Sequence, residues 1–255
     1  MKFNKIKSTV DWKELLFKAK VSKPIYYTVS GSHLYGFNST DSDVDIRGAH
    51  CEELPNLIGL NHEPDFREFT EGEMDFVSFD VRKEMLLILA NNSNVLEHLA
   101  APAIYKSKHY LELKQLAEDS LSKLVAKPYR GMAQHNLQNY LRTFNESFRE
   151  APVKKYLYVM RALMAGICAL ERKRIEPNIK RLNKLRTFQI PVVDELVELK
   201  QRGKEKDFMA GNAEADKAID VLFKHFAHAE ENSSLPPAPM TYQRANDLLV
   251  KWRME

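Results

Sequence analysis

The chain has 255 residues, of which 44% are hydrophobic and 29% are charged, and its formal net charge at pH 7 is +3. This length allows a sizeable core in one or two domains, and this composition is that of a globular protein rather than a disordered or fibrous one. A net charge this small excludes binding of nucleic acid through overall basicity, so any nucleic-acid site must be a local patch.

Cysteine usage and hydropathy indicate the compartment. The two cysteines, Cys51 and Cys168, lie far apart, and neither has a partner at metal-ligand spacing. We interpret them as free thiols in a reducing compartment. No signal peptide precedes the first helical pattern, and the longest apolar run, 157–170, contains Arg161 and is too short to span a bilayer. These features predict a cytoplasmic protein with no membrane contact.

The first hundred residues alternate between helical and strand patterns, bounded by Gly and Pro. Asp80, with Glu84 near the first turn that follows, is typical of a helix N-cap. The predicted elements in chain order are a helix over 10–20, a strand over 25–29, a turn and short helix over 31–37, a strand over 43–49, an irregular segment over 56–70, a strand over 73–79 and a helix over 80–90.

From residue 109 onward almost every segment has a helical pattern. The predicted helices cover residues 110–124, 129–148, 152–173, 177–185, 192–201, 213–228 and 242–252, with a Pro-rich connector over 233–239. We therefore predict an α+β protein, in which a mixed sheet with flanking helices over residues 1–105 forms the catalytic domain. An all-helical domain over residues 106–255 follows, and the active site is expected between the two.

The stretch from Ser30 to Gly48 carries the clearest chemical signal. A predicted strand ends at Gly31 and Ser32 and turns into a short helix, where glycine permits close backbone approach and the exposed N–H groups and serine hydroxyl suit a phosphate. Further along, Asp43 and Asp45 are spaced two apart on a strand, which places both carboxylates on one face. Two like charges this close repel, so we expect Mg²⁺ to neutralise them.

Phosphoryl transfer with two metal ions calls for a further carboxylate nearby. Asp75 is the candidate, because it lies on the next predicted strand, which can pair beside the first. Asp80 is the alternative, although its position is more typical of a helix cap. Arg47 points to the same face as the aspartates. We interpret it as a partner that orients the carboxylates, and an ordinary salt bridge is an equally good explanation.

The joint spacing of these residues resembles the DNA polymerase β superfamily of nucleotidyltransferases. The longer pattern is similar to one branch, the bacterial and phage RNA-repair-associated polymerase β-like proteins. The residues that carry the resemblance are Gly31, Ser32, Gly36, Asp41, Asp43, Asp45, Arg47, Gly48 and Asp75, with the segments 80–83 and 91–97. It covers the first hundred residues well and implies a polymerase β-type palm for the catalytic domain.

The resemblance also implies an activity and a set of ligands. The enzyme would transfer a nucleoside monophosphate from ATP or another nucleoside triphosphate to a hydroxyl acceptor, an RNA or other nucleic-acid end, and release pyrophosphate. Two Mg²⁺ ions, for which Mn²⁺ can substitute, would be held by Asp43, Asp45 and Asp75. Gly31 and Ser32 would hold the β- and γ-phosphates.

The helical half resembles the same branch more loosely. Lys154, Tyr158 and Arg161 are spaced four and three apart, so they share one helix stripe. The family has a Lys…His…Arg pattern there, with Tyr158 in place of the histidine, and the resemblance implies that the stripe binds the triphosphate and stabilises the leaving pyrophosphate. A solvated helix edge explains the stripe nearly as well.

A basic cluster in the helical half indicates a binding site for an RNA backbone, and a solvated charged face is at least as good an explanation. Its members are Arg172, Lys173, Arg174, Lys180, Arg181, Lys184 and Arg186.

Three alternatives to nucleic-acid transfer remain. Asp41, Asp43 and Asp45 have the spacing of an EF-hand calcium loop, but Ile46 stands where that loop requires glycine. The second alternative is a nucleotide-binding module without transfer. The third is a regulatory or toxin–antitoxin component that nucleotidylates a partner protein. Labelled RNA would support repair or tailing, and labelled protein would support the regulatory function.

Overall fold

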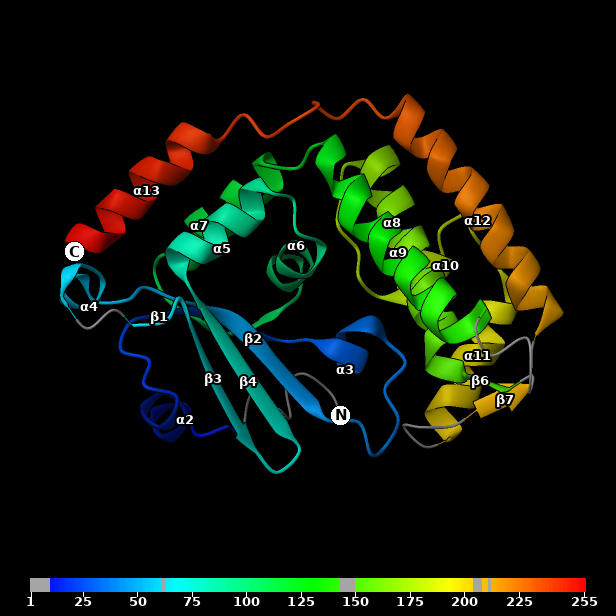
Figure 1. Cartoon of the computed structure of the whole chain (residues 1–255), viewed down its shortest axis with the longest axis horizontal. Coiled ribbons are helices and arrows are strands. Elements are labelled where there is room, and N and C mark those ends of the chain that lie inside the picture. Colours follow the sequence, from blue (N-terminus) through cyan, green and yellow to red (C-terminus); the bar gives the residue numbers. More distant parts are fainter. Residues whose placement is uncertain (1–9, 61–62, 143–149, 204–207, 211) are drawn as a thin grey trace. The chain divides into compact units, whose positions relative to one another are not determined.

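The computed structural model describes residues 10–60, 63–142, 150–203, 208–210 and 212–255 (Figure 1). By their contacts the residues form two units. The first comprises residues 1–31, 43–121 and 238–255, and the second comprises residues 32–42 and 122–237. The chain therefore enters the second unit twice, and the boundary expected at residue 105 stays a prediction.

A five-stranded mixed sheet forms the centre of the first unit (Figure 1). Its strands, in spatial order, are β3 (Phe66–Glu71), β4 (Met74–Asp80), β2 (Val44–His50), β1 (Pro24–Val29) and β5 (Ala103–Lys106). β2 and β4 pair in parallel, and the other neighbours are antiparallel. The α+β class predicted from the sequence is confirmed.

Helices cover both faces of this sheet. The helices of this unit are α2 (Trp12–Lys18), α4 (Leu54–Ile58), α5 (Val81–Leu89), α6 (Ser93–Ala100), α7 (Tyr110–Asp119) and α13 (Tyr242–Met254), of which α13 packs against α5. Tyr26 and Tyr27 are fully buried and, as successive strand residues, point to opposite faces. Tyr27 stacks on Trp12 of α2 at a centroid distance of 5.6 Å, and Tyr26 lies 5.7 Å from the ring of Tyr110 in α7.

The second unit is built around one long buried helix, α9 (Val153–Arg172). It packs against α8 (Ala126–Asn136), α10 (Ile179–Asn183), α11 (Pro191–Arg202) and α12 (Ala213–Asn232), as Figure 1 shows. Gly166 permits this close packing, because an added Cβ would lie 2.3 Å from a ring carbon of Phe226 and 2.9 Å from the Cβ of Tyr129. The unit also holds a short 3₁₀ helix (Lys123–Val125), a π-helical turn (Leu137–Arg142) and a two-stranded sheet of β6 (Glu150–Pro152) and β7 (Phe208–Ala210).

Several sequence expectations for these elements are wrong or incomplete, among them the helix expected over 110–124, which ends at Asp119. Segment 56–70, expected to be irregular, contains the end of α4 and most of β3, which pairs with β4 through a turn at Gly72 (φ +59°). β3 is an edge strand rich in charged residues, and its sequence pattern is therefore weak. The helix expected over 129–148 begins at Ala126 and turns π-helical at Leu137, and residues 143–149 lie outside the described part of the chain. Of the helices described, none has the length and hydropathy to cross a membrane.

Candidate active site

The backbone of Gly31 lies directly against the side chain of Asp45. Gly31 has a φ of +61°, and an added Cβ would lie only 2.1 Å from Asp45 Oδ2. The Ser30 N–H donates a 2.8 Å hydrogen bond to the carbonyl oxygen of Asp45, which fixes the end of β1 beside β2. Glycine is therefore required at position 31 both for its left-handed backbone and for the carboxylate that approaches it.

Asp45 and Asp75 face each other across the parallel strands β2 and β4, where they are register partners. Their side chains are 29% and 41% exposed, and Arg47 bridges them. Its Nη2 atom donates to Asp45 Oδ1 at 2.8 Å and to Asp75 Oδ2 at 2.6 Å, while its Nη1 donates to the Asp75 carbonyl oxygen at 2.7 Å. The sequence-based pairing of the two strands is confirmed, and two carboxylates converge on one cationic nitrogen.

Asp43 lies one residue before β2 begins and is exposed. Within the described residues, no group of three or more acidic, histidine or cysteine side chains is arranged so that it could hold a metal ion. The structure therefore brings together Asp45 and Asp75 but does not gather Asp43 with them. The assignment of all three to metal binding stays a prediction.

Behind Gly31, the side chain of Ser30 contacts a buried histidine that sequence reasoning missed. Ser30 Oγ lies 3.0 Å from Nε2 of His98 in α6. Burial, with a smaller contribution from the nearby Arg47 charge, lowers the pKa of His98 to about 3, so its ring is neutral at physiological pH. The only signal in the sequence is that His98 directly follows segment 91–97, which resembles the family.

Ser32 opens segment 32–42, which by its contacts belongs to the second unit. Asn178 donates through Nδ2 to the Leu34 carbonyl oxygen at 3.2 Å, and the buried Lys200 donates to Ser39 Oγ at 2.9 Å. Glycine is also required at position 36. Its φ is +88°, and an added Cβ would lie 2.6 Å from the Asn178 side chain.

The stripe predicted on α9 lies against the same segment. Arg161 is fully buried, and its guanidinium carbon lies 3.6 Å from the ring centroid of Tyr35. Tyr158 meets the rings of Tyr35 and Phe37 edge-on, at centroid distances of 5.8 and 5.5 Å. Lys154 is half-buried. The stripe thus supports the residues that follow Ser32, and its contact with a nucleotide stays a prediction.

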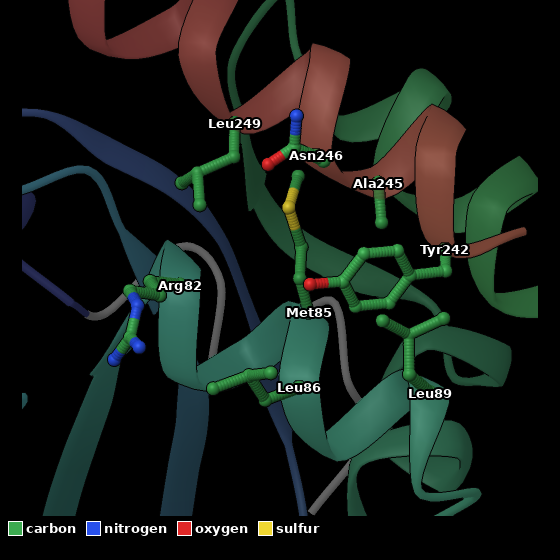
Figure 2. A pocket seen from close by; sticks show the side chains of 8 residues that line it. All are labelled: Arg82, Met85, Leu86, Leu89, Tyr242, Ala245, Asn246 and Leu249. Atoms are coloured by element: carbon green, nitrogen blue, oxygen red, sulfur yellow. The ribbon is translucent and has the colours of Figure 1, made fainter.

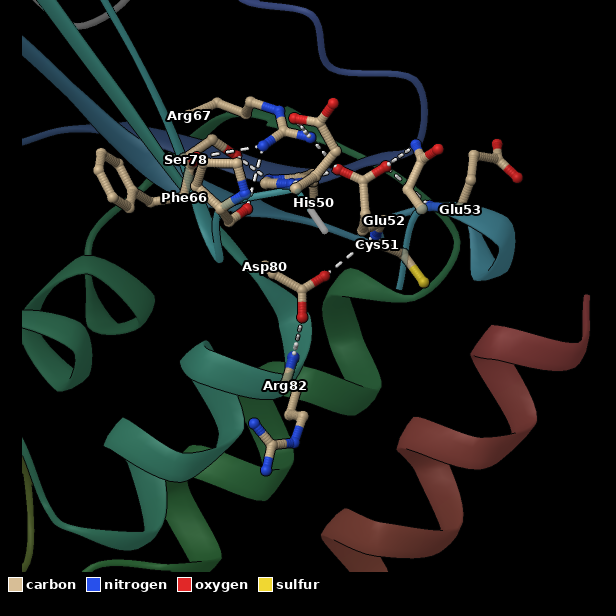
Figure 3. A network of polar contacts seen from close by, with 12 residues as sticks. His50, Cys51, Glu52, Glu53, Phe66, Arg67, Ser78, Asp80 and Arg82 are labelled. Carbon is tan, nitrogen blue, oxygen red and sulfur yellow. Dashed lines mark hydrogen bonds and ion pairs between the residues drawn. The ribbon is translucent and has the colours of Figure 1, made fainter. Parts of the chain in front are cut away.

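A second polar cluster lies at the other ends of β2 and β4 (Figure 3). His50 Nδ1 is 2.8 Å from Ser78 Oγ, and Arg67 of β3 forms an ion pair with Glu52. Burial lowers the pKa of His50 and outweighs the carboxylates of Asp80 and Glu52, which raise it. This cluster joins three strands and lies apart from Asp45 and Asp75 along the same strands.

Comparison with known proteins identifies the family of this chain. A family model described as "RNA repair pathway DNA polymerase beta family" matches residues 6–251. The chain is 31% identical over 189 residues to the uncharacterized protein MJ0002 of Methanocaldococcus jannaschii, covering 72% of this chain and 75% of that one. It is 28% identical over 147 residues to the uncharacterized protein YcgL of Bacillus subtilis, covering 56% of this chain and 55% of that one. The resemblance inferred from the sequence is confirmed, and the chain belongs to the RNA repair pathway DNA polymerase beta family of polymerase β-like nucleotidyltransferases.

Proposed function

We propose that this chain is a Mg²⁺-dependent nucleotidyltransferase that moves a nucleoside monophosphate from a nucleoside triphosphate to a hydroxyl group at an RNA end. The observation that carries the proposal is the convergence of Asp45 and Asp75 on one nitrogen of Arg47, beside the bare backbone of Gly31. The family supplies the reaction class, and its description, which names an RNA repair pathway, supports the choice of RNA as the acceptor.

The carboxylates fit a divalent cation. Mg²⁺ usually takes one or two protein carboxylates and completes its coordination with water and substrate phosphates. Asp45 and Asp75 already hold a positive group between them, so this position favours positive charge. They would hold the metal, with Asp43 as the predicted additional carboxylate. When bound, Mg²⁺ would offset the negative charge of the triphosphate, and Mn²⁺ has a similar preference for oxygen ligands.

Residues of this chain would transfer the proton and bind the phosphates. The acceptor hydroxyl oxygen attacks the α-phosphorus, its proton passes to the Asp75 carboxylate, and the bond to the departing pyrophosphate breaks. Gly31, which has no side chain, and the Ser32 hydroxyl would hold the β- and γ-phosphates, as the resemblance implies. In the α9 stripe, Lys154 and Tyr158 supply donors to the pyrophosphate. Arg161, whose guanidinium carbon lies 3.6 Å from the ring centroid of Tyr35, is the third member of that predicted stripe.

Transfer of label from an α-labelled nucleoside triphosphate to an RNA oligonucleotide tests the proposal. Asp45→Asn and Asp75→Asn should each lower the rate by at least about a hundredfold, because metal-held charge stabilisation is worth several kcal/mol and each 1.36 kcal/mol is about tenfold. Glu68→Gln is the matched control, since Glu68 is an exposed carboxylate on the edge strand β3. Equal transfer by all four proteins would contradict the proposal.

A second readout does not depend on activity. Mg²⁺ should raise the thermal midpoint of the wild type and of Glu68→Gln, and it should have a much smaller effect on Asp45→Asn and Asp75→Asn. If label appears on a protein rather than on RNA, the acceptor is a partner protein. If the triphosphate binds and nothing becomes labelled, the chain is a nucleotide-binding module.

A further inference from the structure

The positive charge of this chain is concentrated in one short segment. Residues 171–190 contain seven of the 38 basic residues and only two of the 35 acidic ones, a net charge of +5. The other 235 residues contain 31 basic and 33 acidic residues, a net charge of −2. The segment covers the end of α9, all of α10 and the loop up to α11. The small net charge of the chain therefore conceals one strongly basic region on a slightly acidic molecule.

The two acidic residues of this segment are already engaged. Glu176 is 94% buried and lies within 4 Å of Arg174 and Arg181, at 3.3 and 3.8 Å. Both arginine side chains remain largely exposed, at 72% and 67%. Glu171 is 2.7 Å from Nε2 of His225 in α12. The carboxylates therefore hold the segment in place and leave most of its positive charge facing solvent.

Three further cations have no ion-pair partner among the residues that the structure describes. Lys173 ends α9 in the left-handed conformation (φ +53°), and Lys184 and Arg186 follow α10. All three are exposed. The carbonyl groups at the C-terminus of α9 favour the nearby positive charge, but a helix end accounts for one or two cations rather than for seven.

We propose that the cations of this segment form a binding surface for the phosphate backbone of RNA. This α9–α10 basic surface consists of Arg172, Lys173, Arg174, Lys180, Arg181, Lys184 and Arg186. A local patch on a molecule of small net charge is the electrostatic pattern expected of such a site. The identification of RNA rests on the proposed function, in which an RNA end is the acceptor.

The composition of the surface favours RNA over an anionic membrane. Interfacial binding to lipid requires large apolar side chains that insert beside the basic ones. None of the exposed large hydrophobic side chains in the described part of the chain lies within 171–190. Phe188, in the same segment, is half-buried and its ring centroid lies 6.2 Å from that of His225 in α12.

The test compares two triple variants of equal charge in the full-length protein. Lys173→Gln, Lys184→Gln and Arg186→Gln together remove three cations from the surface without touching the ion pairs of Glu176. The control removes three exposed lysines elsewhere, by Lys106→Gln, Lys127→Gln and Lys217→Gln. Binding of a single-stranded RNA of about 15 nucleotides is measured by fluorescence anisotropy without nucleotide or Mg²⁺, at several salt concentrations.

We expect the salt dependence of RNA binding to change in the surface variant and not in the control. Each phosphate contact on a single strand contributes about 0.7 to the slope of log affinity against log salt, so the surface variant should lose up to about 2 from that slope. The control should retain the wild-type slope. Equal weakening of both variants, or of neither, overturns the proposal, and so does tighter binding to vesicles of anionic lipid than to RNA.

This experiment separates the surface from the proposed reaction. Wild type that binds RNA through the surface but transfers no label would contradict the transferase and leave the surface in place. Wild type that transfers label to RNA while the surface variant binds like the control would contradict the surface and leave the transferase in place.

Discussion

Glu84 is a carboxyl group in α5 that is almost fully buried and accepts a 2.6 Å hydrogen bond from the hydroxyl of Tyr26 in β1. Burial raises its pKa to about 8, although the Tyr26 hydrogen bond acts in the opposite direction. An unfolded chain loses this proton near pH 4.5. The stability that the bound proton contributes is therefore complete below about pH 4.5 and is lost as the pH rises through about 8.

We expect Glu84→Gln to remove this pH dependence, because glutamine keeps the shape of the protonated acid and cannot ionise. Relative to wild type, the variant should gain unfolding free energy as the pH rises from about 6.5 to about 8.5, by up to about 2 kcal/mol at 1.36 kcal/mol per pH unit. Urea denaturation at several pH values measures this difference, with Glu68→Gln as the exposed control. A difference that does not change with pH would refute the assignment.

His98 sets the lower limit of that pH range. Its folded pKa of about 3 lies below the ordinary value of 6.5, so the unfolded chain takes up a proton that the folded chain rejects. Stability through His98 is therefore present above about pH 6.5 and decreases as the pH falls toward 3. As the pH falls below 6.5, the stability contributed by His98 decreases while that contributed by Glu84 increases. Above pH 6.5, only the contribution of Glu84 changes with pH.

Among the elements, α13 contacts the end of β4 through Arg253. Arg253 donates to both oxygens of Asp80 at 2.6 and 2.7 Å, and to the carbonyl oxygen of Glu52 at 2.6 Å. Asp80 also accepts from the backbone N–H groups of Glu52 and Arg82, as Figure 3 shows. Burial alone would raise the pKa of Asp80, but the Arg253 contact and these hydrogen bonds lower it. The N-cap role expected for Asp80 is confirmed.

We expect Arg253→Met to destabilise the protein by about 3–5 kcal/mol, because it leaves the buried Asp80 carboxylate without its cation. Asp80→Asn combined with Arg253→Met should lose less than the sum of the two single changes, since the amide carries no charge. Urea denaturation of the four proteins gives the coupling energy. Additive losses would show that the pair contributes no interaction of its own.

Local patterns predicted the elements that carry the candidate site, because their signals are short-range. The alternation around Asp45 and Asp75 identified β2 and β4, and the cap at Asp80 identified α5. Contacts between distant segments could not be predicted in this way. His98 reaches Ser30 from 68 residues away, and α13 meets α5 in a pocket formed by side chains about 160 residues apart (Figure 2). Arg82, Met85, Leu86, Leu89, Tyr242, Ala245, Asn246 and Leu249 line that pocket.

At the scale of the whole molecule, the first unit is assembled from three separate stretches of chain. Residues 238–255 return to it after the whole helical unit has been traversed. Trp252 of this last stretch is 99% buried and packs on His109 at a centroid distance of 4.8 Å. The sequence shows a Pro-rich connector before α13, but the unit that α13 joins depends on tertiary contacts alone.

This arrangement predicts that deletion of residues 238–255 weakens the first unit selectively. The deletion exposes the α5 face that α13 covers and removes the cation of Asp80, so the loss should exceed that of Arg253→Met. The chain has two tryptophans, and the deletion leaves only Trp12, whose ring stacks on Tyr27 within the first unit. Its fluorescence therefore reports that unit, whereas far-UV circular dichroism is dominated by the helices of the second.

In urea, the Trp12 transition of the truncated chain should move to lower denaturant and precede the loss of helix. Trp252→Phe in the full-length chain is the matched reference, because Trp12 is again the sole tryptophan while phenylalanine retains much of the buried apolar area. The gap between the two transitions should be wide in the truncated chain and narrow in this reference. Coincident transitions in both would mean that the last eighteen residues stabilise the chain as a whole, and the selective role of α13 would be wrong.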